Sequence, residues 1–374
     1  MVEPPPSAWW SAGNGVGIDN RSQRNTLNGN FVGTTADGDR ALGNHGNGVS
    51  IDGANFNALV GCTFANQPFV YYNVISGNQQ HGLLVTDADR TLVHANFFGV
   101  GADNTAVIGN GLNGIEVNGS SRHTQVGGVI PLGNVSAGNK LNGIDVAGTA
   151  SYFTTFNTFG GLLAFKGAAP NERDGLLVTS TGGHNLVRTN VFSGNARNGI
   201  ELSGNASGVT IDPNIAGLTT KGNAALPNRN DGVLIDGSAH DNTIGGDTAS
   251  VIPQNTFSGN HGYGLVIIGS AYDNSVFTTF IGTNVPGTKA LGNGKGGVLI
   301  SGRAHGNSIG NTGKPPVNLI SGNTSSGVWL AVGSIGNRVI DNYIGLSRFG
   351  KPLRNTGKPV VNDGRHNIVK GNIW

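Results

Sequence analysis

Three acidic residues occupy the same place in a phrase that recurs along the whole chain. The phrase is a glycine, an aliphatic residue, any residue and a second aliphatic residue, and in three copies the third residue is Glu116, Asp145 or Glu201. The two aliphatic positions alternate as in a strand with one buried face, so the third position should point away from the core. Asp174 and Asp231 stand directly before the glycine of their own copies. We therefore expect an acidic strip along one face of the protein.

Carboxylates stacked in this way suit acid–base chemistry. If consecutive copies form neighbouring strands, the backbones of Glu116 and Asp145 lie ~4.8 Å apart, and Glu201 lies roughly 10 Å from Asp145. Two carboxylates ~5–5.5 Å apart suit a retaining glycosidase, and ~6.5–9.5 Å suits an inverting one. Like charges this close raise the pKa of one of them, as a general acid requires. We interpret Glu116, Asp145 and Glu201 as candidate catalytic residues of a glycoside hydrolase.

Other side chains near the strip are candidates for substrate binding. Arg173, Asp174 and Asp231 border the same face, and Tyr263 and Trp329 are aromatic residues further along the chain that suit stacking on sugar rings. Two alternatives remain open for the acids. They are solvated outward residues of the kind that solenoids carry, or they bind a sugar or metal ion without catalysis.

The recurring phrase also predicts the fold. A fixed period of about 32 residues is typical of a solenoid, and each period contains three short alternating runs joined by Gly and Asn, which indicates three strands per coil. The six-residue period of left-handed β-helices is absent, so we predict a single all-β, right-handed parallel β-helix of about eleven coils. Asparagines recur ten residues after the phrase glycine and suit ladders along stacked turns. The eleven copies begin at Gly15, Gly48, Gly82, Gly114, Gly143, Gly175, Gly199, Gly232, Gly264, Gly297 and Gly327, and the asparagines are Asn25, Asn185, Asn242, Asn274, Asn307 and Asn337.

The runs Asn-x-Ile-x-Gly-Asn and Gly-Val-x-Ile-x-Gly resemble the right-handed parallel β-helix repeat proteins of the pectate-lyase-like superfamily. The resemblance extends over residues 13–374, which we take as one β-helix domain after a leader of residues 1–12. It implies a fold but no single activity, since the superfamily includes lyases, hydrolases, epimerases, phage tailspikes and surface proteins. The chain lacks the motifs of the polygalacturonases (Asn-Thr-Asp, Asp-Asp and Gly-His-Gly), the Asp-Pro-His-Asp motif of the alginate epimerases, and the calcium-and-arginine signature of the pectate lyases.

Composition narrows the classes of partner. The chain has 374 residues, 64 of them glycine, only 12% charged residues and a formal net charge of +2, so neither nucleic acid nor an anionic membrane is implied. Cys62 is the only cysteine, which excludes an internal disulfide and a cysteine metal cluster. No histidine pair has metal-ligand spacing, so we expect no metal site and no cofactor. No apolar run long enough for a membrane span and no signal peptide is present, and we expect a mature or trimmed part of a secreted protein.

These observations favour an extracellular or cell-surface carbohydrate-active protein whose partner is a polysaccharide. A hydrolase is preferred because the carboxylates are paired and no basic cluster stands ready to abstract a proton next to a uronate. The first alternative is a non-catalytic surface, adhesion or glycan-binding module, favoured by the regularity of the repeat. The second alternative is a polysaccharide lyase.

Overall fold

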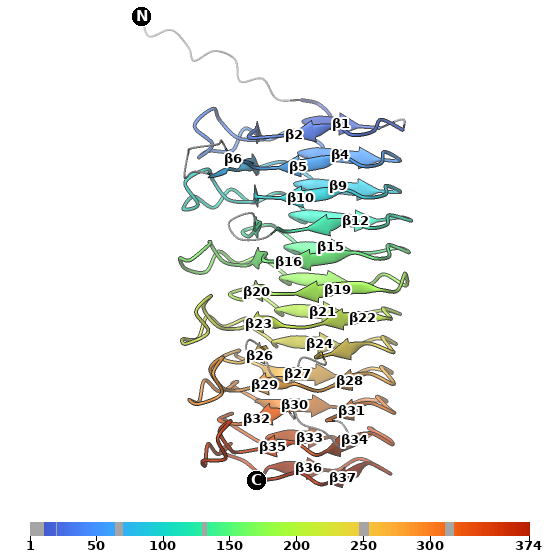
Figure 1. The fold of residues 1–374 in the computed structure, drawn as a ribbon, viewed down its shortest axis with the longest axis vertical. Helices are drawn as coiled ribbons and strands as arrows, with labels where there is room; N and C mark the ends of the chain where they lie inside the picture. The colour runs from blue at the N-terminus through green and yellow to red at the C-terminus, as the bar shows by residue number, and fades with distance from the viewer. Residues whose placement is uncertain (1–10, 20, 64–69, 129–132, 247–253, 311–317) are drawn as a thin grey trace, which may run out of the picture.

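The protein is a solenoid in which three strands make up each coil. The computed structural model describes residues 11–19, 21–63, 70–128, 133–246, 254–310 and 318–374, and Figure 1 shows the coils stacked along one axis from the N-terminus to the C-terminus. Strands at the same place in successive coils pair in parallel, and they form three long sheets. No helix is present in the described residues. This confirms the predicted all-β parallel β-helix. Residues 1–10 and the side chain of Cys62 lie outside the described part, and the boundary at residues 12/13 stays a prediction.

Sheet A contains the recurring phrase and has twelve strands. The twelfth begins after Pro359, which stands where the other copies have glycine, so the sequence pattern alone ended one coil too early. The strands of sheet A are β1 (Val16–Ile18), β4 (Val49–Asp52), β9 (Leu83–Thr86), β12 (Ile115–Asn118), β15 (Ile144–Val146), β18 (Leu176–Val178), β21 (Ile200–Leu202), β24 (Val233–Ile235), β27 (Tyr263–Ile267), β30 (Gly296–Ile300), β33 (Val328–Leu330) and β36 (Val360–Asn362).

Sheets B and C complete the coils with twelve and eleven strands. Sheet B consists of β2 (Thr26–Leu27), β5 (Ala58–Val60), β10 (Leu92–His94), β13 (Gln125–Val126), β16 (Thr154–Phe156), β19 (Asn185–Arg188), β22 (Val209–Ile211), β25 (Thr243–Ile244), β28 (Ser275–Val276), β31 (Ser308–Ile309), β34 (Arg338–Ile340) and β37 (Ile368–Lys370). Sheet C consists of β3 (Phe31–Val32), β8 (Asn73–Ile75), β11 (Asn96–Phe98), β14 (Val135–Ser136), β17 (Phe159–Gly160), β20 (Asn190–Phe192), β23 (Asn214–Ala216), β26 (Asn255–Phe257), β29 (Thr279–Ile281), β32 (Leu319–Ile320) and β35 (Tyr343–Ile344). A short antiparallel pair, β6 (Cys62–Thr63) and β7 (Val70–Tyr71), stands apart from them.

The aliphatic residues of the phrase form the core. Ile144 and Val146 of β15 are fully buried, whereas Asp145 between them points to the outer face and is half-buried. The inward residues of all three sheets join into one apolar cluster that runs along the rod. Removing this surface from water supplies the main stabilisation of the coil stack, at ~25 cal/mol per Å² of apolar area.

The phrase begins with glycine because the next coil passes too close for a side chain. A Cβ atom built on Gly143 would lie 2.6 Å from the carbonyl oxygen of Gly175 in the following coil. This contact is shorter than real Cβ contacts, so any other residue would push the coils apart. Glycine therefore recurs once per coil because successive coils approach each other closely at this position.

Asparagine ladders satisfy the turns between the sheets. The side-chain amide of Asn242 donates to that of Asn274 at 3.0 Å, Asn274 donates to Asn307 at 2.9 Å, and Asn307 donates to Asn337 at 3.0 Å. Each of these amides also donates to a backbone carbonyl of the preceding coil. The structural role predicted for the recurring asparagines is confirmed here.

Loops project from one side of the rod, as Figure 1 shows on the left. They follow strands of sheet C in alternate coils, and each closes through an antiparallel bridge such as Thr34 with Ala41 or Thr283 with Ala290. No helix long and apolar enough to cross a membrane occurs within the described ranges.

Candidate functional site

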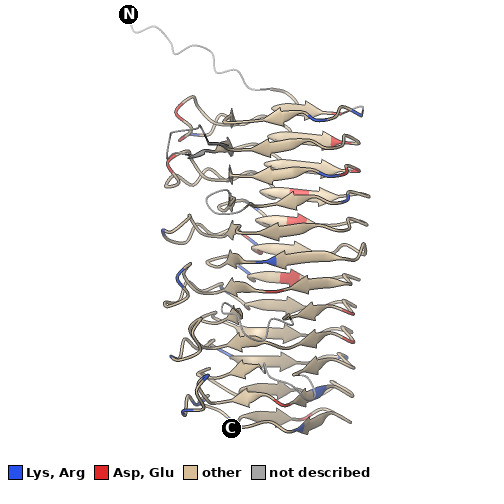
Figure 2. Cartoon of the chain, in the orientation of Figure 1, with Lys and Arg blue, Asp and Glu red and all other residues tan. Residues whose placement is uncertain are grey.

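The predicted acidic strip lies on the outer face of sheet A. Glu116 on β12 is paired in register with Asp145 on β15, Asp145 with Leu177 on β18, and Leu177 with Glu201 on β21. Figure 2 shows red patches, which mark Asp and Glu, on strands of the middle coils. The sequence therefore placed the three carboxylates in one column, and Leu177 separates the Glu116–Asp145 pair from Glu201.

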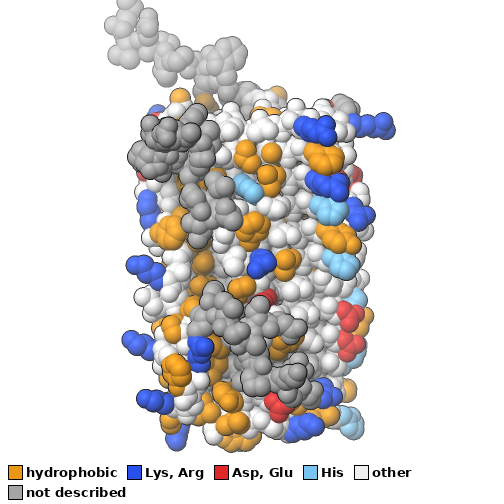
Figure 3. Space-filling model, viewed as in Figure 1, with side chains coloured by type: hydrophobic (Ala, Val, Ile, Leu, Met, Phe, Trp, Pro, Cys, Tyr) orange, Lys and Arg blue, Asp and Glu red, His pale blue; other side chains and the backbone are white. Residues whose placement is uncertain are grey.

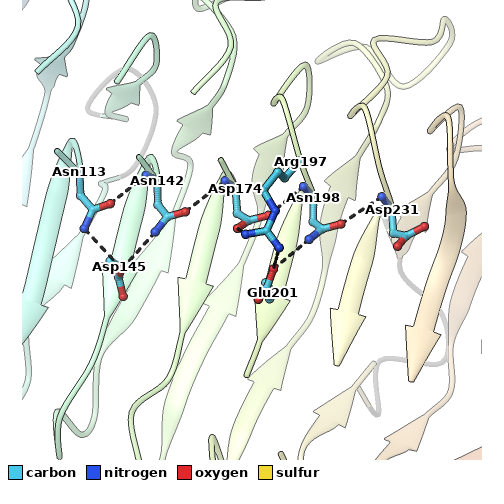
Figure 4. A network of polar contacts seen from close by, with 8 residues as sticks. All are labelled: Asn113, Asn142, Asp145, Asp174, Arg197, Asn198, Glu201 and Asp231. Atoms are coloured by element: carbon cyan, nitrogen blue, oxygen red, sulfur yellow. Dashed lines mark hydrogen bonds and ion pairs between the residues drawn. The ribbon is translucent and has the colours of Figure 1, made fainter. Parts of the chain in front are cut away.

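A ladder of side chains at the start of the sheet A strands holds the strip in place (Figure 4). In each step the side-chain oxygen of one coil accepts a hydrogen bond from the backbone N–H of the next coil. The steps are Asn113 to Asn142 (2.8 Å), Asn142 to Asp174 (3.1 Å), Asp174 to Asn198 (2.8 Å), Asn198 to Asp231 (3.1 Å) and Asp231 to Tyr263 (2.6 Å). Asp174 and Asp231 thus each use one carboxylate oxygen as a structural acceptor, where sequence reasoning saw only substrate binding.

Glu116 and Asp145 share a hydrogen-bond donor. The side-chain amide of Asn113 lies 2.7 Å from Glu116 Oε2 and 3.4 Å from Asp145 Oδ2. Asn142 adds a second donor to Asp145 Oδ2 at 3.1 Å, and Asn118 donates to Glu116 Oε1 at 3.3 Å. The other oxygen of Asp145 is buried and has no hydrogen-bond partner. The two carboxylates therefore form one network rather than two separate surface charges.

Glu201 belongs to a second group, which contains a cation that sequence reasoning missed. Arg197 places its guanidinium 3.3 Å from Glu201 Oε2 and 3.7 Å from Asp174 Oδ2, and Asn198 donates to Glu201 Oε2 at 2.9 Å. The predicted Arg173 stands one coil earlier at the same place in the turn, where its side chain is exposed. The available signal was the spacing, because Arg197 precedes Glu201 by four residues.

The strip is more buried than outward positions of a solenoid would suggest. Only 9% of Glu116 and 7% of Glu201 are exposed, and Asp174 is fully buried. Neighbouring strands and the ladder amides shield these carboxylates. The alternative of an ordinary solvated surface does not describe them.

Burial changes the protonation of the strip. It raises the pKa of Asp145 to about 7, with a further contribution from the negative charge of Glu116. It likewise raises the pKa of Glu201 to about 7, assisted by the charge of Asp174. The pKa values of Glu116, Asp174 and Asp231 are also raised, in each case chiefly by burial. The strip therefore retains protons near neutral pH, which ordinary surface carboxylates do not.

This protonation should appear in the stability of the protein. The ordinary pKa values of Asp145 and Glu201 are 3.8 and 4.5, so between these values and about pH 7 the folded state binds more protons than the unfolded chain. Their contribution to the free energy of unfolding must then fall as the pH rises through this window. We expect Asp145→Asn/Glu201→Gln to gain stability over the wild type between pH 4.5 and pH 8, by more than the ~1.4 kcal/mol of one pKa unit.

Urea denaturation of both proteins at the two pH values measures this difference. Asp241→Asn/Asp273→Asn, on the corner between sheets A and B, is the matched control and should show no such gain. A double variant whose advantage is equal at both pH values would contradict the buried, protonated strip.

The two aromatic residues predicted for substrate binding lie apart from the carboxylate pairs. Tyr263 is half-buried at the start of β27, where its backbone N–H joins the ladder at Asp231. Trp329 on β33 is 38% exposed and donates its indole N–H to Asp363 Oδ2 at 2.9 Å. Four strand steps separate it from Glu201, or ~19 Å at 4.8 Å per step. The structure therefore does not bring Trp329 together with the carboxylates.

Other possible sites are few. In the described ranges, no group of three or more His, Cys, Asp or Glu is arranged to hold a metal ion. A cavity of about 380 Å³ lies over sheet C, where Phe97, Phe159 and Val191 line it, and not over the acidic strip. The strip combines carboxylates whose pKa values are raised by burial with the guanidinium of Arg197.

Comparisons with known proteins show that this chain is similar to solved structures in its fold. No protein-family model matches the chain, and no curated protein matches it either. Among solved structures, the A-module of the mannuronan C-5 epimerase AlgE4 of Azotobacter vinelandii is 15% identical, with 93% of this chain and 90% of that chain covered and a TM-score of 0.47. Pectate lyase Pel9A is 15% identical, with 97% and 69% covered and a TM-score of 0.35. PfbA, a surface adhesin of Streptococcus pneumoniae, is 10% identical, with 94% and 71% covered and a TM-score of 0.27.

The fold is a parallel β-helix built from three long sheets. Parallel strands joined by crossovers of this kind turn right-handedly in nearly all proteins. At such low identities the likeness extends to the β-helix alone, and the chemistry must be argued from the strip.

Proposed function

We propose that this β-helix is an extracellular or cell-surface carbohydrate-active protein that hydrolyses an extended polysaccharide along the outer face of sheet A. The observation that carries the proposal is the Glu116–Asp145 pair, two carboxylates on adjacent strands that share the amide of Asn113. The raised pKa of Asp145, about 7, leaves a proton available for donation at neutral pH. A protonated acid beside a second carboxylate is the arrangement that glycosidic cleavage uses.

The distances favour a retaining mechanism. The shared amide lies 2.7 Å from Glu116 Oε2 and 3.4 Å from Asp145 Oδ2. These two oxygens are therefore closer than the ~6.5–9.5 Å that an inverting enzyme leaves for an attacking water. We assign Asp145 as the general acid and Glu116 as the carboxylate that stabilises or attacks the sugar carbon. Asn113 positions both residues.

The second group extends the substrate face. Arg197 lies between Glu201 and Asp174, and 40% of its side chain is exposed. A guanidinium in this place suits hydrogen bonding to sugar hydroxyls or carboxylates two coils away from the Glu116–Asp145 pair. We assign Glu201 and Arg197 to substrate binding next to the cleavage position.

A panel of polysaccharides, assayed for new reducing ends and for unsaturated products, tests this function. A hydrolase releases reducing ends without the absorbance of an unsaturated uronate. Unsaturated products would identify a lyase and overturn the assignment of Asp145. Absence of cleavage across neutral, acidic and acetylated glycans would remove the catalytic proposal.

A non-catalytic glycan-binding module is the second candidate, and Trp329 favours it. Its ring is exposed on the same face as the strip but four strands away, so it suits a chain that binds along the rod without cleavage. Stacking of a sugar on an exposed aromatic ring contributes on the order of 1 kcal/mol.

If this second candidate holds, Trp329→Ala should weaken binding of the preferred polysaccharide about fivefold, as measured by affinity electrophoresis. Phe349→Ala removes another exposed aromatic, on a loop beyond sheet C, and should leave binding unchanged. Equal effects of the two substitutions would show that the tryptophan has no specific role.

A further inference from the structure

A row of basic and aromatic side chains runs along the corner between sheets A and B. We call it the corner row and define it by six residues, one from each of the first six coils: Arg24, Phe56, Arg90, His123, Tyr152 and His184. Figure 3 shows it in the upper half of the right edge, where basic, hydrophobic and histidine side chains alternate in one line. The carboxylates of the acidic strip lie within the strands of sheet A, before the chain reaches this corner, so the two features consist of different residues.

The members of the row are in strict register. Each backbone N–H donates to the carbonyl of the residue that precedes the next member, as from Arg24 to Asn55 and from Phe56 to Asp89. The row therefore rises by one coil per residue, about 4.8 Å, and covers roughly 24 Å parallel to the axis.

The side chains of the row stack on one another. Phe56 lies between two guanidiniums, with Arg90 at 5.2 Å and Arg24 at 5.8 Å from the ring centre. Tyr152 lies between two imidazoles, with centroid distances of 5.0 Å to His123 and 4.9 Å to His184. Both faces of the Phe56 and Tyr152 rings are thus occupied by neighbours, although both residues remain exposed.

The backbone conformation at the six positions of the row is energetically unfavourable for residues with large side chains. All six members have φ between 52° and 63°, in the left-handed region that glycine and Asp or Asn adopt most easily. Later coils place Gly208, Asp241 and Asp273 at the same step of the turn. Six consecutive coils hold a large side chain in this unfavourable conformation, whereas among the later coils only the last does so in the described residues, with His366. The unbroken run in the first six coils indicates a role for the side chains themselves.

The corner row carries positive charge, and acidic residues nearby neutralise part of it. Arg122 lies beside the row with its guanidinium 5.4 Å from the Tyr152 ring, and neither it nor Arg24 makes an ion pair with the described residues. Asp89 accepts from both Arg90 and His123, yet 53% of the Arg90 side chain remains exposed. Asp87 is also close by, where it bonds Ser120. Three arginines and two histidines therefore face these two acids.

We propose that the corner row binds a linear anionic polysaccharide, carboxylated or sulfated, aligned with the axis of the rod. Arginine edges suit carboxylate and sulfate groups. Stacking holds the guanidinium and imidazole planes before the ligand arrives, which reduces the entropy lost on binding. Single-stranded nucleic acid is the less suitable partner, because its bases need free aromatic faces. In this row the aromatic faces are already covered.

The proposal does not depend on cleavage at sheet A, and the experiment separates the two. Binding is measured by affinity electrophoresis in an Asp145→Asn background, so that cleavage cannot consume the probe. Polygalacturonate is the carboxylated probe, its fully methyl-esterified form is the uncharged control of the same backbone, and heparin is the sulfated probe. We expect binding of at least one anionic probe, no binding of the ester, and at least tenfold weakening from 50 to 300 mM NaCl.

Substitutions locate the site. Arg24→Gln/Arg90→Gln should weaken the binding at least tenfold. Lys221→Gln/Arg348→Gln removes the same charge from the projecting loops and should change it less than twofold. Phe56→Leu keeps both arginines but removes the ring that orders them, and we expect about threefold weakening with an unchanged thermal transition.

Three results would overturn the proposal. These are equal binding of the ester, equal loss in the two double variants, and tighter binding of a single-stranded DNA oligonucleotide than of either anionic glycan. If the corner variants lose binding while cleavage of short substrates persists, the corner row and the acidic strip act independently. Loss of the sheet A activity alone leaves the corner row intact.

Discussion

Replacing Asp145 with asparagine is expected to lower the rate of polysaccharide cleavage at least 100-fold. The substitution keeps the size of the side chain and an oxygen that can accept from Asn113 and Asn142, but it removes the acidic proton. A positioned general acid contributes typically 10²–10⁴ to a rate, so the loss should appear in kcat with little change in KM. Release of reducing ends from the best substrate of the panel measures both constants.

The pH dependence of the cleavage rate should also change in Asp145→Asn. Burial and the charge of Glu116 raise the pKa of Asp145 to about 7, so its protonated fraction falls as the pH rises through neutrality. The rate of the wild type should therefore decline on the alkaline side of about pH 7. In Asp145→Asn this alkaline decline should disappear, because the group that titrates is gone.

Two further variants make this test specific. Glu116→Gln should also lower kcat, and it should move the alkaline decline to lower pH, since the neighbouring negative charge that helps to raise the pKa of Asp145 is removed. Asp241→Asn, an exposed acid on the corner between sheets A and B, is the control and should leave activity unchanged. Undiminished activity in Glu116→Gln and Asp145→Asn would show that the pair has no catalytic role.

The second large effect is expected in the core. Ile144→Asp should destabilise the coil stack by several kcal/mol. The substitution gives up the ~2–5 kcal/mol of a buried aliphatic side chain, and it places a carboxyl with no partner among apolar residues. Ile144 is fully buried in the apolar cluster that runs along the rod. Loss of the cooperative thermal transition, or a marked fall in its midpoint by circular dichroism, is the expected result.

Two neighbouring residues on one strand provide a control for this effect. Ile300 of β30 is fully buried, whereas Leu299 beside it points to the outer face and is half-buried. Ile300→Asp should destabilise as Ile144→Asp does, and Leu299→Asp should cost much less. Similar midpoints for the two variants of β30 would mean that the inward and outward faces of the sheet were assigned incorrectly.

The coil and its inward and outward faces can be predicted from the repeat in the sequence. Glycine recurs because each coil passes close to the next, and aliphatic residues alternate because only one face of a short strand is buried. Both patterns are local, so they can be read from the chain without coordinates. They predicted the parallel β-helix, the column that contains Glu116, Asp145 and Glu201, and the asparagine ladders. They missed the twelfth coil only because Pro359 stands at the glycine position.

The surroundings of each side chain become visible only in the folded protein. Burial of the outward carboxylates depends on the strands on either side, and the sharing of Asn113 by two acids depends on contacts between coils about 30 residues apart. Arg197 precedes Glu201 by four residues in the same coil, but its second contact, with Asp174 of the preceding coil, is visible only in the structure. The members of the corner row recur at one place in successive coils, but they are of four residue types, and only the structure shows that their side chains stack. The repeat pattern tells which positions lie side by side in neighbouring coils, but burial and side-chain contacts depend on packing across those coils.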